Sequence, residues 1–215
     1  MKLYVLSKDV AVANEAQILD NLFANGLEHL HLRKPETSND EVADLLSQIE
    51  PAYYDRIALH QFHDLAEEFG IRRLHFTTGH RKHVGQNELL KYRQAGYTLS
   101  TSVHNWFEIK GLENFNTLFY SPVFDSLSKP GYAGTLTNDF ILEDIYKERL
   151  IALGGISIYN IKQTKIMGFG AAAVLGAIWN DPSTALKNFV DLKKHLQECN
   201  SSHPRSVNTI FTKPY

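Results

Sequence analysis

The segments LIALGGIS at residues 150–157 and AAAVLGAIW at residues 171–179 decide the fold. Each is a short run of aliphatic residues that ends in glycine, and a stretch of helical length separates the two runs. This order is typical of parallel strands joined by crossover helices, because a parallel connection has to return the chain along the sheet. The two segments therefore predict consecutive β/α units of an α/β protein.

Six similar units precede these two. The predicted strands span Leu3–Leu6, His29–Arg33, Ile57–His60, Arg73–Phe76, Thr98–Ser102, Leu118–Ser121, Leu150–Leu153 and Ala172–Leu175. Eight units at roughly 25 residues each are typical of a single closed (β/α)8 TIM barrel with a parallel eight-stranded sheet. A doubly wound open sheet uses the same alternation, but no glycine-rich dinucleotide motif follows the first strand, where the sequence reads SKDVAVAN. We expect the barrel over residues 1–199 and a polar C-terminal tail over residues 200–215.

Two of the intervening segments carry clear helix signals. Asn14–Asn25 has an apolar stripe at helical spacing and stops at Gly26. A second helix is expected after Ser38, where Glu41 three residues on completes a capping box.

Composition narrows the class of partner. The 215 residues carry a net charge of −2 without a basic run, which argues against nucleic acid and membrane surfaces. The single cysteine, Cys199, allows no internal disulfide. No apolar stretch has the length of a signal peptide or a membrane span. We expect a cytoplasmic protein that acts on a small molecule and could form homo-oligomers.

The glycines after the last two strands predict a phosphate site. Gly154 and Gly155 follow the seventh strand and Gly176 follows the eighth, where bare backbone can approach phosphate oxygens. These two loops form the common phosphate site of such barrels. The alternative is that each glycine only makes a tight turn.

His104, in TSVHNWFE just past the fifth strand, is the best candidate for a general acid and base. Alternatively, Ser102 or Asn105 starts the next helix and His104 points away from the barrel mouth.

The loop SPVFDSLSKPGYAG at residues 121–134 is too long for a plain turn. Its hydroxyls and ammonium, at Ser126, Ser128 and Lys129, could close over an anion. A solvated loop without a ligand is equally compatible with this composition.

Histidine pairs raise the question of a metal. His29, His31 and Arg33 alternate along the second strand and should point into the barrel, with Arg33 outermost. Metal-dependent barrel hydrolases use such a His-x-His pair, but they also need an acid at a strand end, and AAAVLG has none. His60 and His63 have ligand-like spacing, yet a simpler interpretation is that one ends a strand and the other sits on a helix. We therefore predict no metal ligands.

Several motifs occur in the order found in a known superfamily. HLRKP at 31–35 is similar to Gln-Leu-Arg-Glu-Lys, STSVH at 100–104 to Gly-Val-Ser-x-His, SPVFDSLSKP at 121–130 to Gly-Pro-Val-Phe-x-Thr-x-Thr-Lys, and IALGGIS at 151–157 to Ile-Gly-Gly-Ile. LHQFHDLA at 59–66 is similar to Leu-Ile-Asn-Asp-Arg-x-Asp-Leu-Ala. Over nearly the whole chain, the sequence thus resembles the thiamin phosphate synthases and their relatives, the TenI-type thiazole tautomerases.

The resemblance implies that the glycines hold a thiazole phosphate and, in the synthases, that a pyrimidine diphosphate lies near Arg33 and the loop at 126–129. The catalytic residues we expect are His104, as the general acid and base, and Ser102, which would orient the substrate ring or His104 itself. The expected substrate-binding residues are Arg33, His31, His60, Gln61, Ser126, Ser128, Lys129, Gly154, Gly155 and Gly176.

Two positions depart from the synthase pattern. The synthases hold magnesium with two aspartates, which align here with Gln61 and roughly with His80, and amide or imidazole is a poor ligand for a hard dication. The sequence therefore favours a metal-independent thiazole tautomerase, in which His104 aromatises a carboxylated thiazole phosphate by moving a proton and no cofactor is needed.

Two alternatives stay open. The serines and lysine at 126–129 favour a thiamin phosphate synthase, which joins hydroxymethylpyrimidine diphosphate to thiazole phosphate and releases pyrophosphate. It would need Mg²⁺ held by other acids, for which Asp64, Glu67 and Asp125 are candidates. The chain could also be a non-catalytic protein that binds thiazole phosphate or thiamin phosphate.

Overall fold

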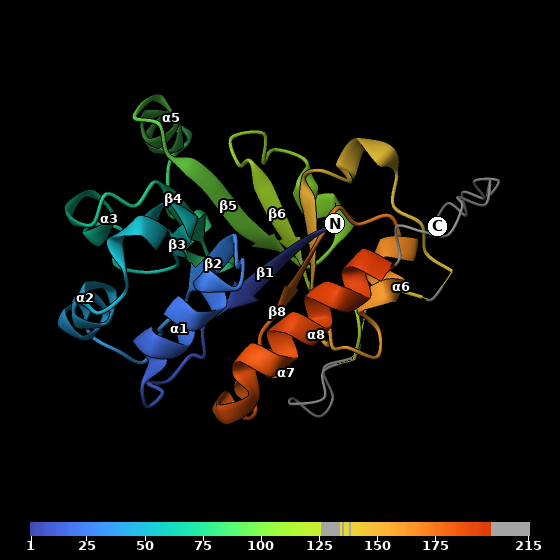
Figure 1. The fold of residues 1–215 in the computed structure, drawn as a ribbon. Coiled ribbons are helices and arrows are strands. Elements are labelled where there is room, and N and C mark those ends of the chain that lie inside the picture. Colours follow the sequence, from blue (N-terminus) through green and yellow to red (C-terminus); the bar gives the residue numbers. More distant parts are fainter. Residues whose placement is uncertain (126–133, 135, 138, 199–215) are drawn as a thin grey trace.

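Eight parallel strands close into one barrel in a computed structural model of the chain (Figure 1). The structure describes residues 1–125, 134, 136–137 and 139–198. The strands follow each other in sequence order around the barrel, and the last pairs with the first. They are β1 (Lys2–Leu6), β2 (His29–Leu32), β3 (Ile57–Leu59), β4 (Arg73–Phe76), β5 (Thr98–Val103), β6 (Thr117–Tyr120), β7 (Leu150–Leu153) and β8 (Ala171–Val174). The TIM barrel is confirmed, and every strand end lies within one residue of its predicted position.

Helices cover the outside of the barrel. They are α1 (Glu15–Ala24), α2 (Asn39–Ser47), α3 (Leu65–Glu68), α4 (Thr78–Arg81), α5 (Gln86–Gln94), α6 (Ile161–Ile166), α7 (Gly176–Trp179) and α8 (Ala185–Glu198). Helix α8 lies beside α1, so the two ends of the barrel sequence close against each other (Figure 1). In the part of the chain that the structure describes, no helix combines the length and the apolar character that crossing a membrane requires.

The predicted helix signals are confirmed. In α1, Leu19, Leu22 and Phe23 are buried, and Gly26 follows with φ +87°. The Ser38 hydroxyl accepts the Glu41 N–H, and the Glu41 carboxylate accepts the Ser38 N–H at 2.7 Å, which is the predicted capping box of α2.

The connection after β5 differs from expectation. In place of a helix, a 3-10 turn spans Trp106–Ile109, and the Asn105 side chain accepts the Glu108 N–H at its start. Only 13 residues separate β5 from β6, which leaves little room for a full helix between the two strands. The chain therefore passes from β5 to β6 through a short 3-10 turn.

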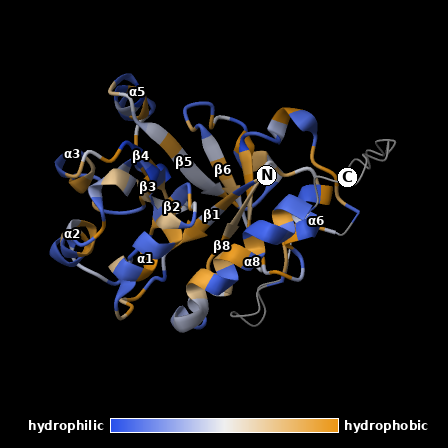
Figure 2. Cartoon of the chain, viewed as in Figure 1, coloured by the Kyte–Doolittle hydropathy of each residue, from blue (hydrophilic) through white to orange (hydrophobic). Residues whose placement is uncertain are grey.

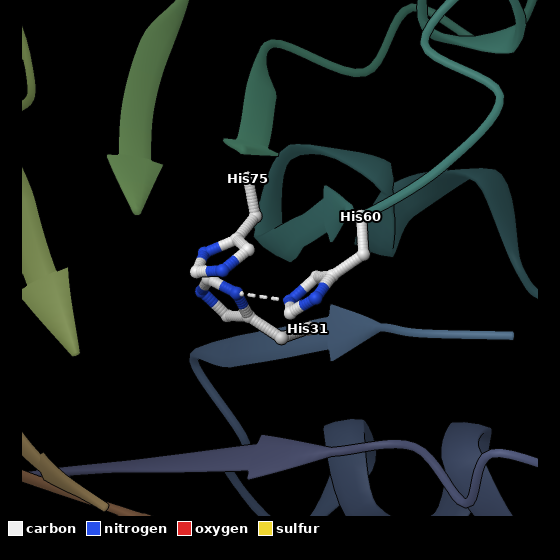
Figure 3. A group of neighbouring side chains, drawn as sticks. All are labelled: His31, His60 and His75. Atoms are coloured by element: carbon white, nitrogen blue, oxygen red, sulfur yellow. Dashed lines mark hydrogen bonds between the residues drawn. The ribbon is translucent and has the colours of Figure 1, made fainter. Parts of the chain in front are cut away.

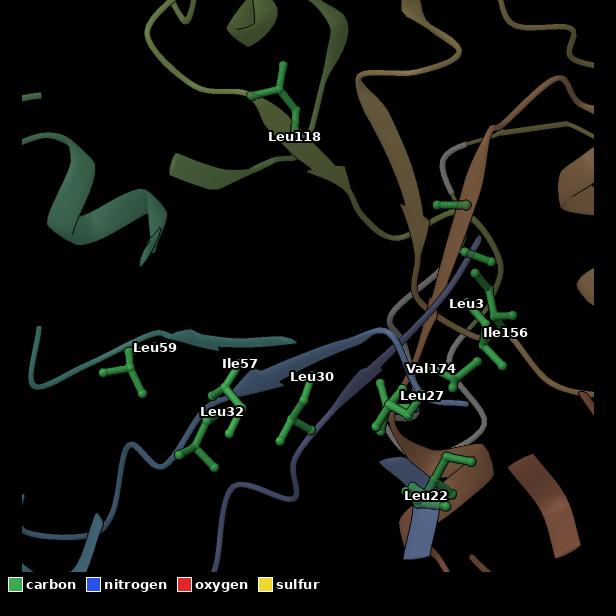
Figure 4. Close-up of a cluster of buried hydrophobic side chains, with 14 of the residues drawn as sticks. Leu3, Leu22, Leu27, Leu30, Leu32, Ile57, Leu59, Leu118, Ile156 and Val174 are labelled. Atoms are coloured by element: carbon green, nitrogen blue, oxygen red, sulfur yellow. The ribbon is translucent and has the colours of Figure 1, made fainter. Parts of the chain in front are cut away.

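The main apolar core lies between the strands and the helices. Figure 4 shows part of it, with Leu30 and Ile57 on neighbouring strands and Leu27 beside Val174, all members of one buried cluster. Apolar residues accordingly concentrate on the strands, while the helices turn many hydrophilic residues outward (Figure 2).

The barrel interior is divided into an apolar and a polar half. A second cluster contains Tyr4 and Leu6 of β1 with Phe119, Ile151, Ala171 and Ala173. The opposite half, from β2 to β5, carries buried polar side chains instead, which are His31, His60, His75 and Ser100. Since inward positions alternate along each strand, this division follows directly from the sequence of the strands and puts polar chemistry on one side of the interior.

Candidate active site at the barrel mouth

A small cavity lies at the C-terminal ends of the strands, where barrels of this kind carry their active sites. Its volume is about 100 Å³, and it is lined by Leu6, Arg33, His60, His75, Thr77, Ser102, Phe119 and Leu153. A larger hollow of about 300 Å³ lies outside the barrel, between α1 and α2. We place the chemistry in the smaller cavity because it joins the predicted residues Arg33, His60 and Ser102.

Arg33 is held at the mouth through its backbone. Its N–H donates to the buried Ser7 hydroxyl at 2.8 Å, and that hydroxyl donates to the Arg33 carbonyl at 3.0 Å. The guanidinium lies 3.8 Å from the carboxylate of Asp9, and both side chains are partly exposed. Such a loose pair leaves donors of the guanidinium available to an anion.

The imidazole of His104 is oriented by the start of the next loop. Its Nδ1 lies 2.8 Å from the carbonyl oxygen of Ser121. A carbonyl oxygen only accepts, so Nδ1 carries the proton and Nε2 carries the lone pair. Nε2 lies 3.5 Å from the Thr78 hydroxyl. This arrangement gives the exposed ring a basic nitrogen at a defined place.

An ion pair that the sequence did not reveal supports His104. The Glu108 carboxylate accepts the backbone N–H of His104 at 3.3 Å and forms an ion pair with Arg81 at 2.9 Å. Arg81 also donates to the carbonyl oxygen of Ser102 at 3.0 Å. The ion pair therefore contacts the end of β5 at both Ser102 and His104. Arg81 reaches this place because α4 packs against β5.

Ser102 contacts a different histidine from the one expected. Its hydroxyl lies 3.2 Å from His75 Nε2 and borders the cavity. His75 was absent from the predicted site, although Arg73 and His75 alternate along β4 and the inward phase of that strand could have revealed it.

The glycines of the phosphate prediction are required by the backbone. Gly154 and Gly155 have φ of +98° and +64°. A Cβ on Gly154 would lie 2.8 Å from Pro122, and one on Gly155 would collide with the backbone of Asp125. These contacts support the tight-turn interpretation. Gly176 begins the short helix α7, in which the N–H groups of Ile178 and Trp179 donate to the Leu175 carbonyl at 3.0 and 3.1 Å.

The residues at the two aligned magnesium positions do not fit that ion. The amide oxygen of Gln61 accepts the Lys34 N–H at 3.0 Å, and His80 is an exposed residue of α4. Of the alternative acids, Asp64 accepts the Asn39 amide and Asp125 accepts the Gly134 N–H. Glu67 is exposed on α3. No step through magnesium follows from these side chains.

Three histidines, His31, His60 and His75, lie close together (Figure 3), and two of them, His60 and His75, line the cavity. His31 Nδ1 lies 3.0 Å from His60 Nε2, and the rings of His60 and His75 stack with centroids 3.9 Å apart. All three are buried. Burial lowers the pKa of His31 and His60 well below the ordinary value and that of His75 to about 3, so the rings are neutral.

The remaining predicted positions have simple outcomes. His63 lies in the turn before α3 and not on the helix, because the positive φ of Phe62 delays the start of that helix. Ser126, Ser128 and Lys129 lie outside the described residues, as does the tail.

Solved structures similar to this chain include two thiamine phosphate pyrophosphorylases. A thiamine phosphate pyrophosphorylase from Bacteroides thetaiotaomicron is similar over 94% of this chain and 100% of its own, with 28% identity and a TM-score of 0.73. One from Pyrococcus furiosus matches over 92% and 96% with 14% identity and a TM-score of 0.69. A 3-hexulose-6-phosphate synthase shares the fold, with 18% identity, 89% and 99% coverage and a TM-score of 0.57.

No protein-family model and no curated protein matches the chain. The similarity rests on the closed barrel, the order of the motifs around its mouth and the full-length match to the Bacteroides enzyme. On these grounds the chain is a TIM barrel similar to the thiamine phosphate pyrophosphorylases.

Proposed function

We propose that the protein is a thiazole tautomerase that aromatises a carboxylated thiazole phosphate by moving one proton. The observation that carries the proposal is the orientation of His104. Its Nδ1 donates to the Ser121 carbonyl at 2.8 Å, which leaves Nε2 to take a proton from one ring position and return it at another. A single well-placed base contributes roughly 10² to 10⁴ in rate. That is enough for a step that ends in an aromatic ring.

The polar groups around the cavity suit an anionic substrate. Arg33 lines the cavity and offers a guanidinium with a loose partner. The short helix α7 begins at Gly176, directly after β8. Ser102 and Thr77 are the two hydroxyl-bearing residues that line the cavity. We assign the phosphate to the loops after β7 and β8, as the resemblance implies, although the turns there already account for Gly154 and Gly155. We assign the carboxylate to Arg33 and the positioning of the ring to Ser102.

The synthase alternative is favoured by one observation, the name and full-length similarity of the Bacteroides structure. Against it stand the side chains at the magnesium positions, because Gln61 is engaged with Lys34 and His80 offers imidazole to a hard ion. A diphosphate leaving group would then lack its usual counter-ion.

A paired assay separates the candidates. Purified protein is given carboxythiazole phosphate and followed for aromatisation, and in parallel is given pyrimidine diphosphate plus thiazole phosphate with magnesium and followed for pyrophosphate. We expect aromatisation that is unchanged by withholding magnesium and that falls at least about 100-fold in His104→Ala. His83→Ala, an exposed histidine away from the cavity, is the matched control.

Other outcomes would overturn the proposal. Pyrophosphate release would make the protein a synthase, and tight thiazole phosphate binding without either reaction would make it a binding protein. Full activity of His104→Ala would remove the base that the proposal depends on.

A further inference from the structure

We propose that His31, His60 and His75 form a binding site for a borderline divalent cation of the zinc class. One ring nitrogen from each lies within 4.8 Å of those of the other two. Around tetrahedral zinc, with Zn–N of about 2.0–2.1 Å, ligand nitrogens are about 3.3–3.4 Å apart. His31 Nδ1 and His60 Nε2 are already 3.0 Å apart. Only a small rearrangement would bring all three nitrogens to one ion.

The donor set selects the class of cation. It consists of three imidazoles, and among the described residues no carboxylate belongs to the group. Neutral nitrogen donors suit zinc, cobalt, nickel and copper, whereas magnesium and calcium require oxygen. Burial also removes competing water and keeps the rings neutral, which a ligand nitrogen requires.

A hydrogen bond outside the cluster prepares His75 for this role. The Ser100 hydroxyl donates to the Leu74 carbonyl, so at His75 Nδ1, 3.0 Å away, it can only accept. Nδ1 therefore carries the proton, and the lone pair is on Nε2, where the ion would replace the contact with the Ser102 hydroxyl at 3.2 Å. Metal-binding histidines commonly use their second nitrogen in this way, which fixes the tautomer and the ring orientation.

His60 has an unsatisfied nitrogen. Its Nδ1 is buried and has no hydrogen-bond partner, which is costly for a polar atom in the interior. The rings of His60 and His75 lie nearly parallel, at 15°, so one must turn before both can direct a lone pair at the same ion. Turning the ring of His60 gives up its 3.0 Å contact with His31 and its stacking on His75, while the torsion about its Cβ–Cγ bond is broad. Bonds to the ion would offset these losses.

The cavity leaves room for a further ligand of the ion. His60 and His75 border it, and His31 lies deeper. Three histidines with one open position are the arrangement of catalytic zinc sites. Arg33, at the same cavity, repels a bare dication, so we expect the open position to hold a hydroxide or another anion.

The test is a titration of the full chain, stripped of metal, with Co²⁺ and Zn²⁺ and without any thiazole compound. Its outcome is therefore separate from that of the proposed reaction. We expect one ion per chain, a tetrahedral Co²⁺ absorption spectrum and a higher melting temperature with metal. Ser100→Ala should weaken binding about 10–100-fold through the orientation of His75.

Two variants, His31→Gln and His60→Asn, replace an imidazole ligand by a neutral, polar amide side chain. Each should weaken binding by more than Ser100→Ala does, while circular dichroism shows a folded chain. His83→Ala, an exposed histidine outside the cluster, should bind like the unaltered protein. Absence of stoichiometric binding by the folded chain, unchanged affinity in both ligand variants, or loss of binding in His83→Ala would each overturn the site.

Discussion

Replacing Lys34 by methionine should destabilise the barrel severely. The Lys34 ammonium lies 2.6 Å from the carboxylate of Glu15 on α1, and the side chains are only 3% and 4% exposed. The ammonium also donates to the Val10 carbonyl at 2.7 Å. The pair fastens the end of β2, next to Arg33, to the first helix.

The structure sets the size of the effect. Without Lys34, Glu15 keeps only the Val12 N–H, 3.3 Å from Oε2, while Oε1 already has no partner. A buried charge left in this way costs about 3–5 kcal/mol. For a chain of this size that corresponds to a fall in melting temperature of roughly 6–20 °C. Exchanging both partners, Lys34→Met with Glu15→Leu, should restore most of the stability because no buried charge remains.

The assay is urea denaturation of the single and double variants, repeated at two pH values. Burial raises the pKa of Glu15, and the nearby Lys34 opposes this rise. Without Lys34, the Glu15 carboxyl group takes up a proton more readily, and a protonated carboxyl carries no buried charge. The loss of unfolding free energy in Lys34→Met should therefore be smaller at acidic than at alkaline pH. A loss below about 1 kcal/mol, or a double variant as unstable as the sum of the singles, would refute the reasoning.

Three further predictions concern the rest of the fold. Gly155→Ala should cost more than about 2 kcal/mol in urea denaturation, because a left-handed φ of +64° adds to a backbone collision, whereas Gly79→Ala, with open space around it, should not destabilise. Burial lowers the pKa of His63 from 6.5 to about 4. Between pH 6.5 and pH 4, His63 is therefore protonated in the unfolded chain but not in the folded one. Stability should therefore fall by up to about 1.4 kcal/mol per pH unit from this residue as pH drops from 6.5 to 4, and His63→Asn should show a correspondingly flatter profile. Trp179→Phe leaves the buried Leu6 carbonyl without the 2.7 Å indole donor and should lose about 1–3 kcal/mol by thermal unfolding, while an unchanged melting temperature would count against this bond.

The sequence alone predicted the architecture and the location of the site. Strand signals, the glycines after β7 and β8 and the capping box at Ser38 are local, because they depend on residues within a few positions of one another. The resemblance of HLRKP and STSVH to a known superfamily located Arg33 and His104, which the structure places at strand ends on the barrel mouth.

Contacts between distant residues required the tertiary structure. His31, His60 and His75 come from the ends of three neighbouring strands, and the register of the barrel alone decides that inward positions of all three meet. The same holds for Lys34 and Glu15, whose charges the sequence shows but whose burial it does not. Periodicity tells which way a side chain points from its own strand, whereas the closing of the barrel decides what it meets there, because that depends on how eight strands are staggered against each other.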